Sequence, residues 1–239
     1  MTSNQFFIKN WPENQKFSLE GEEHHHLARV SRVRTGDKIW LTDGRRKRLL
    51  AEVLRVEEDQ TWLKTISIEE EKLKTDISLW FGLTKPGTGD FIIQKVTELG
   101  VSEIQPMVTR RALRISSDRL GGRLNRWQKI AREALKQSKG AVLPQIRPPE
   151  TLEKLLARAT AELKLFLDED SSVYLKDVLQ AVTPGSVCLA VGPEGGLTAE
   201  EKLKLKENEF KGVSLGQRIL RTETAIISAV AMISHFWNW

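Results

Sequence analysis

The residues best suited to chemistry follow an apolar run late in the chain. Residues 187–191 lead directly into the glycine-rich turn 192–196, and a polar helix is predicted to follow from Thr198. A strand that ends in such a turn before a helix is typical of ligand pockets at the carboxyl ends of parallel strands. Glycines let a ligand approach the main chain closely and leave N–H groups free to bind it. The turn matches neither the GxGxxG nor the GKS/GKT pattern, so a tight connection explains it as well as a binding site does.

A second glycine turn precedes an almost wholly apolar helix predicted for residues 222–236. Thr222 is suited to cap that helix, and Glu223 is favourable in its first turn. Capping does not explain Arg221, a cation at the helix end where the dipole disfavours positive charge. A nearby anion would relieve that cost, whether it is Glu194, a substrate or a phosphate.

The composition is that of a folded protein with one large or two modest domains. The chain has 239 residues, of which 40% are hydrophobic and 29% are charged. No window approaches the ~18 continuous apolar residues of a membrane span, and the first residues lack the layout of a signal peptide. We therefore expect a soluble, cytoplasmic protein without a membrane contact.

We expect no metal site in this chain. The single cysteine, Cys188, excludes a cysteine-based zinc site and is expected to lie in the core. His24, His25 and His26 are interpreted as strand residues, whose side chains alternate between two faces, so at most two of them share a site.

The pattern of apolar residues changes near residue 70. Residues 1–70 contain short strand-like runs with glycine turns, which predict a small β-barrel. After a charged linker, strand-like runs alternate with helical ones, which predicts an α/β domain over residues 74–239 with a largely parallel sheet. The expected strands are 37–42, 49–56, 61–68, 77–83, 104–108, 163–167 and 187–191, and the expected helices are 90–99, 124–139, 200–207 and 222–236.

Positive charge is concentrated in one stretch of the chain. The net charge is +5, yet residues 100–139 hold ten Lys and Arg against three Asp and Glu. Phosphate backbones are common partners of such surfaces, although a solvated helix face is an equal alternative. In residues 45–48 four basic side chains follow the turn at Asp43 and Gly44, and we favour a phosphate contact there. Trp127, on the basic helix, is the candidate for stacking against a base.

The chain resembles a known family through motifs spread over nearly its whole length. GPEGG at 192–196, with LG and ILRTETA within 215–225, is similar to the methyltransferase E family of the small ribosomal subunit, which belongs to the SPOUT superfamily. Further similar motifs are QKVTELGV at 94–101, IQP at 104–106 with Arg110, and an N-terminal set of His26, Val30, Arg32, Gly36, Asp37, Asp43 and Gly44. The resemblance implies an N-terminal PUA-like β-barrel over residues 1–70. It also implies a SPOUT α/β domain with a deep trefoil knot and a mostly parallel sheet.

One stretch departs from the family pattern. The family usually has E-Q-S-x-R, or a close variant, after the long basic helix, whereas this chain has KQSKG at residues 136–140. Lys136 replaces the acid, and the arginine is displaced. The departure bears on the RNA contact at that end of the helix and on the choice of target nucleotide.

The resemblance implies an enzyme that methylates N3 of a uridine in 16S ribosomal RNA, with S-adenosylmethionine as the methyl donor and no metal. Three loops, 167–169, 192–196 and 215–220, would hold the donor. The expected cofactor-binding residues are Leu167, Gly192, Pro193, Glu194, Gly195, Gly196, Leu215, Gly216, Ile219, Leu220 and Thr224. The expected contacts to RNA, or to the small ribosomal subunit, are Arg32, Arg34, Arg45, Arg46, Lys47, Arg110, Arg126 and Lys136.

The expected catalytic residues follow from the chemistry of uridine. N3 carries a proton near neutral pH, so the enzyme must remove that proton or stabilise the anion. Arg221 is expected to stabilise the charge on O4 or O2. Glu223 or Glu194 would act as the base or hold Arg221, and the sequence leaves this choice open.

Two other functions compete with this one. A non-catalytic or retargeted RNA-binding protein on the same scaffold is suggested only by residues 136–140. A nucleotide-binding transferase of another class is disfavoured because the GxGxxG and GKS/GKT patterns are absent. The intact cofactor loops favour the methyltransferase.

A homodimer is expected from the helix at 222–236. Its apolar residues occupy more than one face, and a core covers only one of them. A second subunit would cover the rest. The resemblance also implies a dimer, with the cofactor site near the subunit boundary.

Overall fold

The computed structural model describes residues 5–113 and 116–238. These residues form two compact units. The first holds the described residues up to Lys72 together with Arg132–Leu143, and the second holds Leu73–Ala131 with the described residues from Pro144 onward. The segment Arg132–Leu143 therefore packs with the first unit, although the sequence placed it in the second domain.

The first unit is built on a five-stranded sheet in the order β1-β3-β4-β5-β2. β1 pairs parallel with β3, and the other neighbours pair antiparallel. Alternate residues of β4, namely Leu49, Ala51 and Val53, are buried against Phe6 and Leu41, which is the pattern of a strand with one covered face. The strands are β1 (Gln5–Phe7), β2 (Lys16–Glu20), β3 (Lys38–Thr42), β4 (Lys47–Val56) and β5 (Gln60–Glu70).

The turn between β3 and β4 is fixed by the segment Arg132–Leu143. Gly44 has a φ of +76°, and an added Cβ would lie 2.5 Å from the Cβ of Leu143, so only glycine fits. The Leu143 N–H donates to Gly44 O at 2.9 Å, and the Arg46 N–H donates to Ala141 O at 2.8 Å. The basic tip at residues 45–48 is therefore held in a defined conformation.

The three consecutive histidines lie in helix and not in a strand, so that interpretation was wrong. His24 and His25 belong to α1 (Gly21–His25), and His26 begins a π-helical segment, η1 (His26–Val30). His24 is buried, with Nδ1 2.9 Å from Thr61 Oγ1 and Nε2 3.1 Å from Glu58 O. Both of its ring nitrogens are therefore engaged by protein. Among the described residues no group of three or more potential ligands is placed to hold a metal ion.

The second unit is built on a seven-stranded, all-parallel sheet in the order β12-β10-β11-β6-β7-β8, with β9 also paired to β7. Its central strands are buried on both faces, as parallel strands covered by helices are. Cys188 in β11 is 2% exposed and belongs to this core, as expected. The strands are β6 (Asp76–Gly82), β7 (Glu103–Val108), β8 (Gln145–Ile146), β9 (Glu150–Thr151), β10 (Leu163–Leu167), β11 (Ser186–Val191) and β12 (Lys211–Val213).

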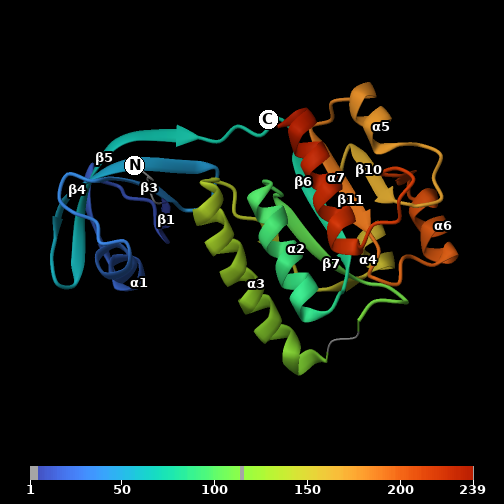
Figure 1. The fold of residues 1–239 in the computed structure, drawn as a ribbon, viewed down its shortest axis with the longest axis horizontal. Coiled ribbons are helices and arrows are strands. Elements are labelled where there is room, and N and C mark those ends of the chain that lie inside the picture. The colour runs from blue at the N-terminus through green and yellow to red at the C-terminus, as the bar shows by residue number, and fades with distance from the viewer. Residues whose placement is uncertain (1–4, 114–115, 239) are drawn as a thin grey trace. The chain divides into compact units, whose positions relative to one another are not determined.

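Helices α2 and α7 lie side by side against the parallel sheet (Figure 1). Ser234 Oγ of α7 donates to Leu99 O at 2.8 Å, beside Gly100, whose φ of +82° follows the end of α2. None of the helices in the described parts of the chain combines the length and the apolar character that crossing a membrane requires. The helices are α2 (Pro86–Glu98), α3 (Ser117–Ser138), α4 (Leu152–Leu156), α5 (Leu175–Ala181), α6 (Ala199–Glu207) and α7 (Thr222–Trp237).

Candidate cofactor and catalytic site

A pocket opens where three neighbouring strands end. β12, β10 and β11 are adjacent in the sheet and parallel, so the loops that follow them meet at one edge. These are the three loops expected from the sequence. The pocket is lined by Leu167, Asp168, Glu169, Val191, Gly192, Pro193, Gly196, Leu197, Lys202, Val213, Ser214, Leu215, Gly216, Arg218, Ile219, Leu220 and Ala225.

Glycine main chain forms part of the pocket wall, for a steric reason at Gly192 and for a conformational reason at Gly216. A Cβ on Gly192 would lie 2.9 Å from Gly196 C and from Leu197 N. Gly216 has a φ of +133°, a conformation that other residues rarely adopt. Leu167 and Val191 add apolar surface. Backbone polar groups beside an apolar wall can hold a flat, polar ring such as a nucleobase.

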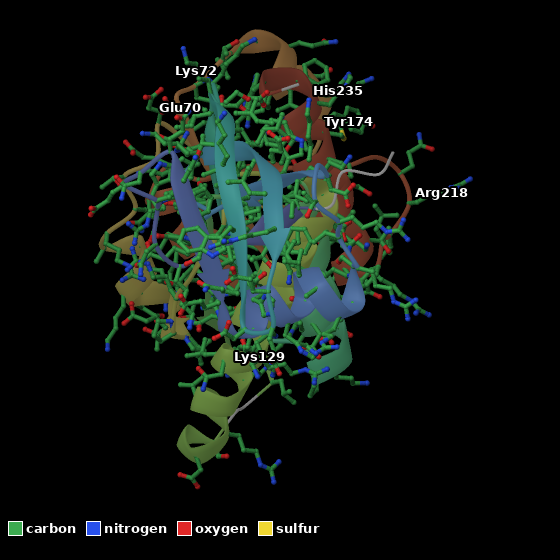
Figure 2. The ribbon with its side chains drawn as sticks, turned by 90° about the vertical axis from the view of Figure 1, so that its left-hand side faces the viewer. Glu70, Lys72, Lys129, Tyr174, Arg218 and His235 are labelled. Atoms are coloured by element: carbon green, nitrogen blue, oxygen red, sulfur yellow. The ribbon has the colours of Figure 1, made fainter. Side chains whose placement is uncertain are left out.

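Eight of the eleven predicted cofactor-binding residues line this pocket. They are Leu167, Gly192, Pro193, Gly196, Leu215, Gly216, Ile219 and Leu220. Glu194, Gly195 and Thr224 are outside the lining. Ile219 is 89% exposed at the pocket edge, and Figure 2 shows the neighbouring Arg218 side chain extending away from the same loop.

An ion pair at the pocket wall was not foreseen from the sequence. The Asp168 side chain is 6% exposed, and its Oδ1 accepts a 2.7 Å bond from Lys202 Nζ. Burial acts to lower the pKa of Lys202, but the hydrogen bonds to Asp168 and Asp170 outweigh it and raise that pKa. The available signal was the acidic run at residues 168–170 directly after a predicted strand. Nothing in the spacing pointed to Lys202.

The GPEGG loop is fixed on the side that Glu194 and Gly195 occupy. The Lys85 N–H donates to Glu194 Oε1 at 3.1 Å, and Arg111 Nη1 donates to Gly195 O at 2.8 Å. A Cβ on Gly82 would lie 2.4 Å from the Pro193 ring, so β6 and the loop touch through a glycine. Glu194 therefore meets the turn before α2 and does not line the pocket.

Arg221 is the N-cap residue of α7, and Thr222 is the first helical residue, so the prediction that Thr222 caps the helix was wrong. Arg221 is exposed, and its side chain makes no hydrogen bond or ion pair with any residue in the described part of the chain. The expected partners Glu194 and Glu223 therefore do not neutralise it. Glu223 lies in the first turn of α7, where negative charge is favourable.

The predicted RNA contacts of the first unit lie mostly on its surface. Arg32, Arg34, Arg45 and Lys47 are exposed, and Arg46 is half-buried with a φ of +67°. Lys136 differs, because its side chain is 9% exposed and its Nζ lies 2.7 Å from Glu133 Oε1. The lysine that departs from the family pattern is thus engaged within the first unit.

In the second unit two predicted RNA contacts have acidic partners. Arg126 Nε donates to Asp90 Oδ2 at 2.7 Å, and Arg110 Nη1 lies 3.9 Å from Glu200 Oε2. The prediction that Trp127 stacks on a base was wrong. Trp127 is fully buried, packs against Phe81 and donates to Asp90 Oδ1, because the apolar side of α3 faces the core. Arg114, part of the basic stretch, lies outside the described residues.

Comparisons with known proteins agree with this architecture. The family model described as an RNA methyltransferase domain matches residues 71–234, and the model described as an RNA methyltransferase PUA domain matches residues 19–66. The second match confirms the PUA-like N-terminal unit.

Individual relatives align over nearly the whole chain. Ribosomal RNA small subunit methyltransferase E of Bacillus subtilis is 33% identical over 92% of this chain and 90% of its own length. The protein of that name from Synechocystis is 33% identical over 91% of this chain and 72% of its own length. A crystal structure of the Neisseria gonorrhoeae protein of that name, bound to S-adenosylmethionine, has a TM-score of 0.88 at 31% identity and 98% coverage of both chains. The chain therefore belongs to the ribosomal RNA small subunit methyltransferase E family.

Proposed function

We propose that this protein transfers a methyl group from S-adenosylmethionine to N3 of a uridine in 16S ribosomal RNA. The observation that carries the proposal is the pocket at the ends of β10, β11 and β12, formed by the three loops that resemble those of the family. The relatives named above are small-subunit ribosomal RNA methyltransferases, and one of them is bound to this cofactor. The position of the methyl group on the base rests on the family resemblance alone.

The residues present fit the cofactor. The donor carries an adenine, for which the main chain near Gly192 and Gly216 and the apolar wall at Leu167 are suited. It also carries a positive sulfonium, and the pocket lining includes the carboxylates of Asp168 and Glu169, which share the Lys202 ammonium. The bound donor supplies an activated methyl group, so the protein must provide only orientation and proton removal.

The catalytic roles are assigned to the start of α7. Arg221 would stabilise negative charge on O4 or O2 of the uracil, because it has no anionic partner in the described structure. Glu223, two residues later, would accept the N3 proton. Glu194 is the alternative base, but one oxygen of its carboxylate already accepts the Lys85 N–H. We therefore give Glu194 the role of fixing the loop.

Several features of the family complete the proposal. We place a trefoil knot in the second unit, 16S RNA contacts on the PUA-like unit, and the enzyme in the cytoplasm, where its substrate is made. We also propose a homodimer, because Ile227, Ala231 and Met232 of α7 are only half-buried and Phe236 is 44% exposed. Light scattering at micromolar concentration should give twice the chain mass, and a monomer mass would contradict this.

A cofactor-binding and transfer assay tests the function. Calorimetry should show S-adenosylmethionine binding without added metal. Isolated small subunits or 16S RNA should then accept a labelled methyl group from the purified protein. RNA binding without cofactor binding would favour the non-catalytic alternative. Cofactor binding without transfer to either substrate would show that the RNA target is wrong.

A further inference from the structure

The GPEGG loop has a second side that faces basic residues. Gly192, Pro193 and Gly196 line the cofactor pocket, whereas Glu194 and Gly195 do not. Glu194 meets the main chain at Lys85, and Gly195 O is bound by the exposed Arg111. A group bound on this second side is separated from the cofactor pocket by the GPEGG loop.

Arg123 of α3 adds a partly desolvated cation to the same place. Its Nη2 donates to Thr84 O at 2.8 Å, one residue before Lys85, and its guanidinium lies 4.7 Å from the Trp127 ring centre. Glycine at position 89 leaves room for the Arg123 guanidinium, since a Cβ on residue 89 would lie 2.7 Å from Arg123 Nη2.

The local environment of Arg123 leaves this cation incompletely satisfied. Burial lowers its pKa, and the charges of Asp90 and Glu194 counteract that effect only in part. Its Nε has no hydrogen-bond partner among the described residues. A guanidinium that has lost water without a full set of acceptors gains from a nearby anion.

The charges around the loop do not cancel. Arg123 and Arg126 interact with the carboxylates of Asp90 and Glu194, while Arg111 binds Gly195 O and Lys85 contacts Glu194 through its main-chain N–H. Lys85 and Arg111 are exposed and form no ion pair with any described residue. Trp127, the aromatic ring that packs on Arg123, is fully buried and so is not available to stack on a base. Exposed guanidinium and ammonium groups are suited to binding phosphate.

We propose that Lys85, Arg111 and Arg123 form a binding site for a phosphodiester group of the target RNA strand, across the GPEGG loop from the cofactor. This inference rests on the proposed function. It adds three residues in the second unit to the RNA contacts expected from the sequence. It also explains why the loop is anchored on this side, since a bound strand is then held at a fixed distance from the methyl donor.

The test measures RNA affinity as a function of salt for Lys85→Gln, Arg111→Gln and Arg123→Gln. Lys85→Gln is the cleanest, because its main-chain N–H to Glu194 remains. Lys206→Gln, an exposed cation on α6, is the matched control. The probe is protein-free 16S RNA in filter binding without cofactor, with S-adenosylmethionine affinity measured separately by calorimetry. Melting temperatures show whether Arg123→Gln still folds.

Each site variant should weaken RNA binding about threefold to tenfold and reduce the slope of log Kd against log salt by about 1. Cofactor affinity should stay within twofold for Lys85→Gln, and the control should match the wild type. If the wild-type protein methylates RNA but the variants keep its slope of log Kd against log salt, the phosphate site is overturned and the proposed function still stands. Weaker binding to intact small subunits but not to bare RNA also overturns it, since the ligand would then be an acidic protein surface. A wild type that binds neither 16S RNA nor intact small subunits overturns both proposals.

Discussion

Replacing Arg221 with alanine should change activity and stability in opposite directions. Arg221 is exposed at the N-terminus of α7 and has no ion pair in the described structure, so its charge opposes the helix dipole without compensation. Removing a cation there stabilises a helix by about 0.3–1 kcal/mol. For a chain of this length that corresponds to a rise in melting temperature of about 1–4 °C.

The same substitution should nearly abolish methylation. A cation already in place stabilises the uracil anion more in the transition state than in the ground state. Loss of one such contact costs about 10²–10³ in rate. Cofactor affinity should change by no more than a few-fold, because Arg221 does not line the pocket. Arg221→Lys should restore only part of the rate, since a point charge lacks the planar fork of a guanidinium.

One set of measurements on Arg221→Ala separates these effects. Differential scanning calorimetry gives the melting temperature, titration calorimetry gives the cofactor Kd, and single-turnover transfer of a labelled methyl group gives the rate. A lower melting temperature together with lost cofactor binding would show that Arg221 only holds the loop. Normal turnover would refute the catalytic assignment outright.

Three further changes test other parts of the site and fold. Lys202→Met leaves the buried Asp168 carboxylate without its ion-pair partner. The free energy of unfolding, measured by denaturant titration, should fall by about 3 kcal/mol. The cofactor affinity, measured by calorimetry, should weaken. Gly192→Ala should weaken cofactor binding because its Cβ meets main chain at 2.9 Å, whereas Gly87→Ala, with nothing within 4 Å, should not; equal affinities would contradict the account of the wall. Burial disfavours the charged form of Glu23 and is the main reason that its pKa is raised. The folded state therefore binds the proton of the Glu23 carboxyl group more tightly than the unfolded state does. The fold should therefore lose stability as pH rises from the ordinary pKa of a glutamate to the raised pKa of Glu23. Glu23→Gln should raise the melting temperature at pH 7 but not at pH 3.5.

Local periodicity was enough to place most of the regular structure. The apolar runs at 163–167 and 187–191 became β10 and β11 within one residue at each end, because buried parallel strands are continuously apolar. β12 has three residues and α4 has five, so neither spans two full periods, and a repeating pattern cannot be detected in either. Neither element was predicted.

Contacts between distant segments were beyond the reach of spacing arguments. Asp168 and Lys202 are 34 residues apart and meet only because α6 and the loop after β10 lie at the same pocket. Trp127 was assigned to an RNA surface because its helix is basic, yet the helix turns that residue into the core. The position of Arg132–Leu143 likewise depends on hydrogen bonds with Gly44 and Arg46, and no local sequence pattern predicts these bonds. The cofactor loops were found because their glycines form recognisable motifs.

Nucleoside mass spectrometry of 16S ribosomal RNA tests the central claim most directly. RNA should be compared from cells that carry this protein, cells that lack it, and cells that lack it but express Arg221→Ala. The account predicts one 3-methyluridine that is present in the first, absent in the second and nearly absent in the third. Unchanged 3-methyluridine in cells that lack the protein would contradict it.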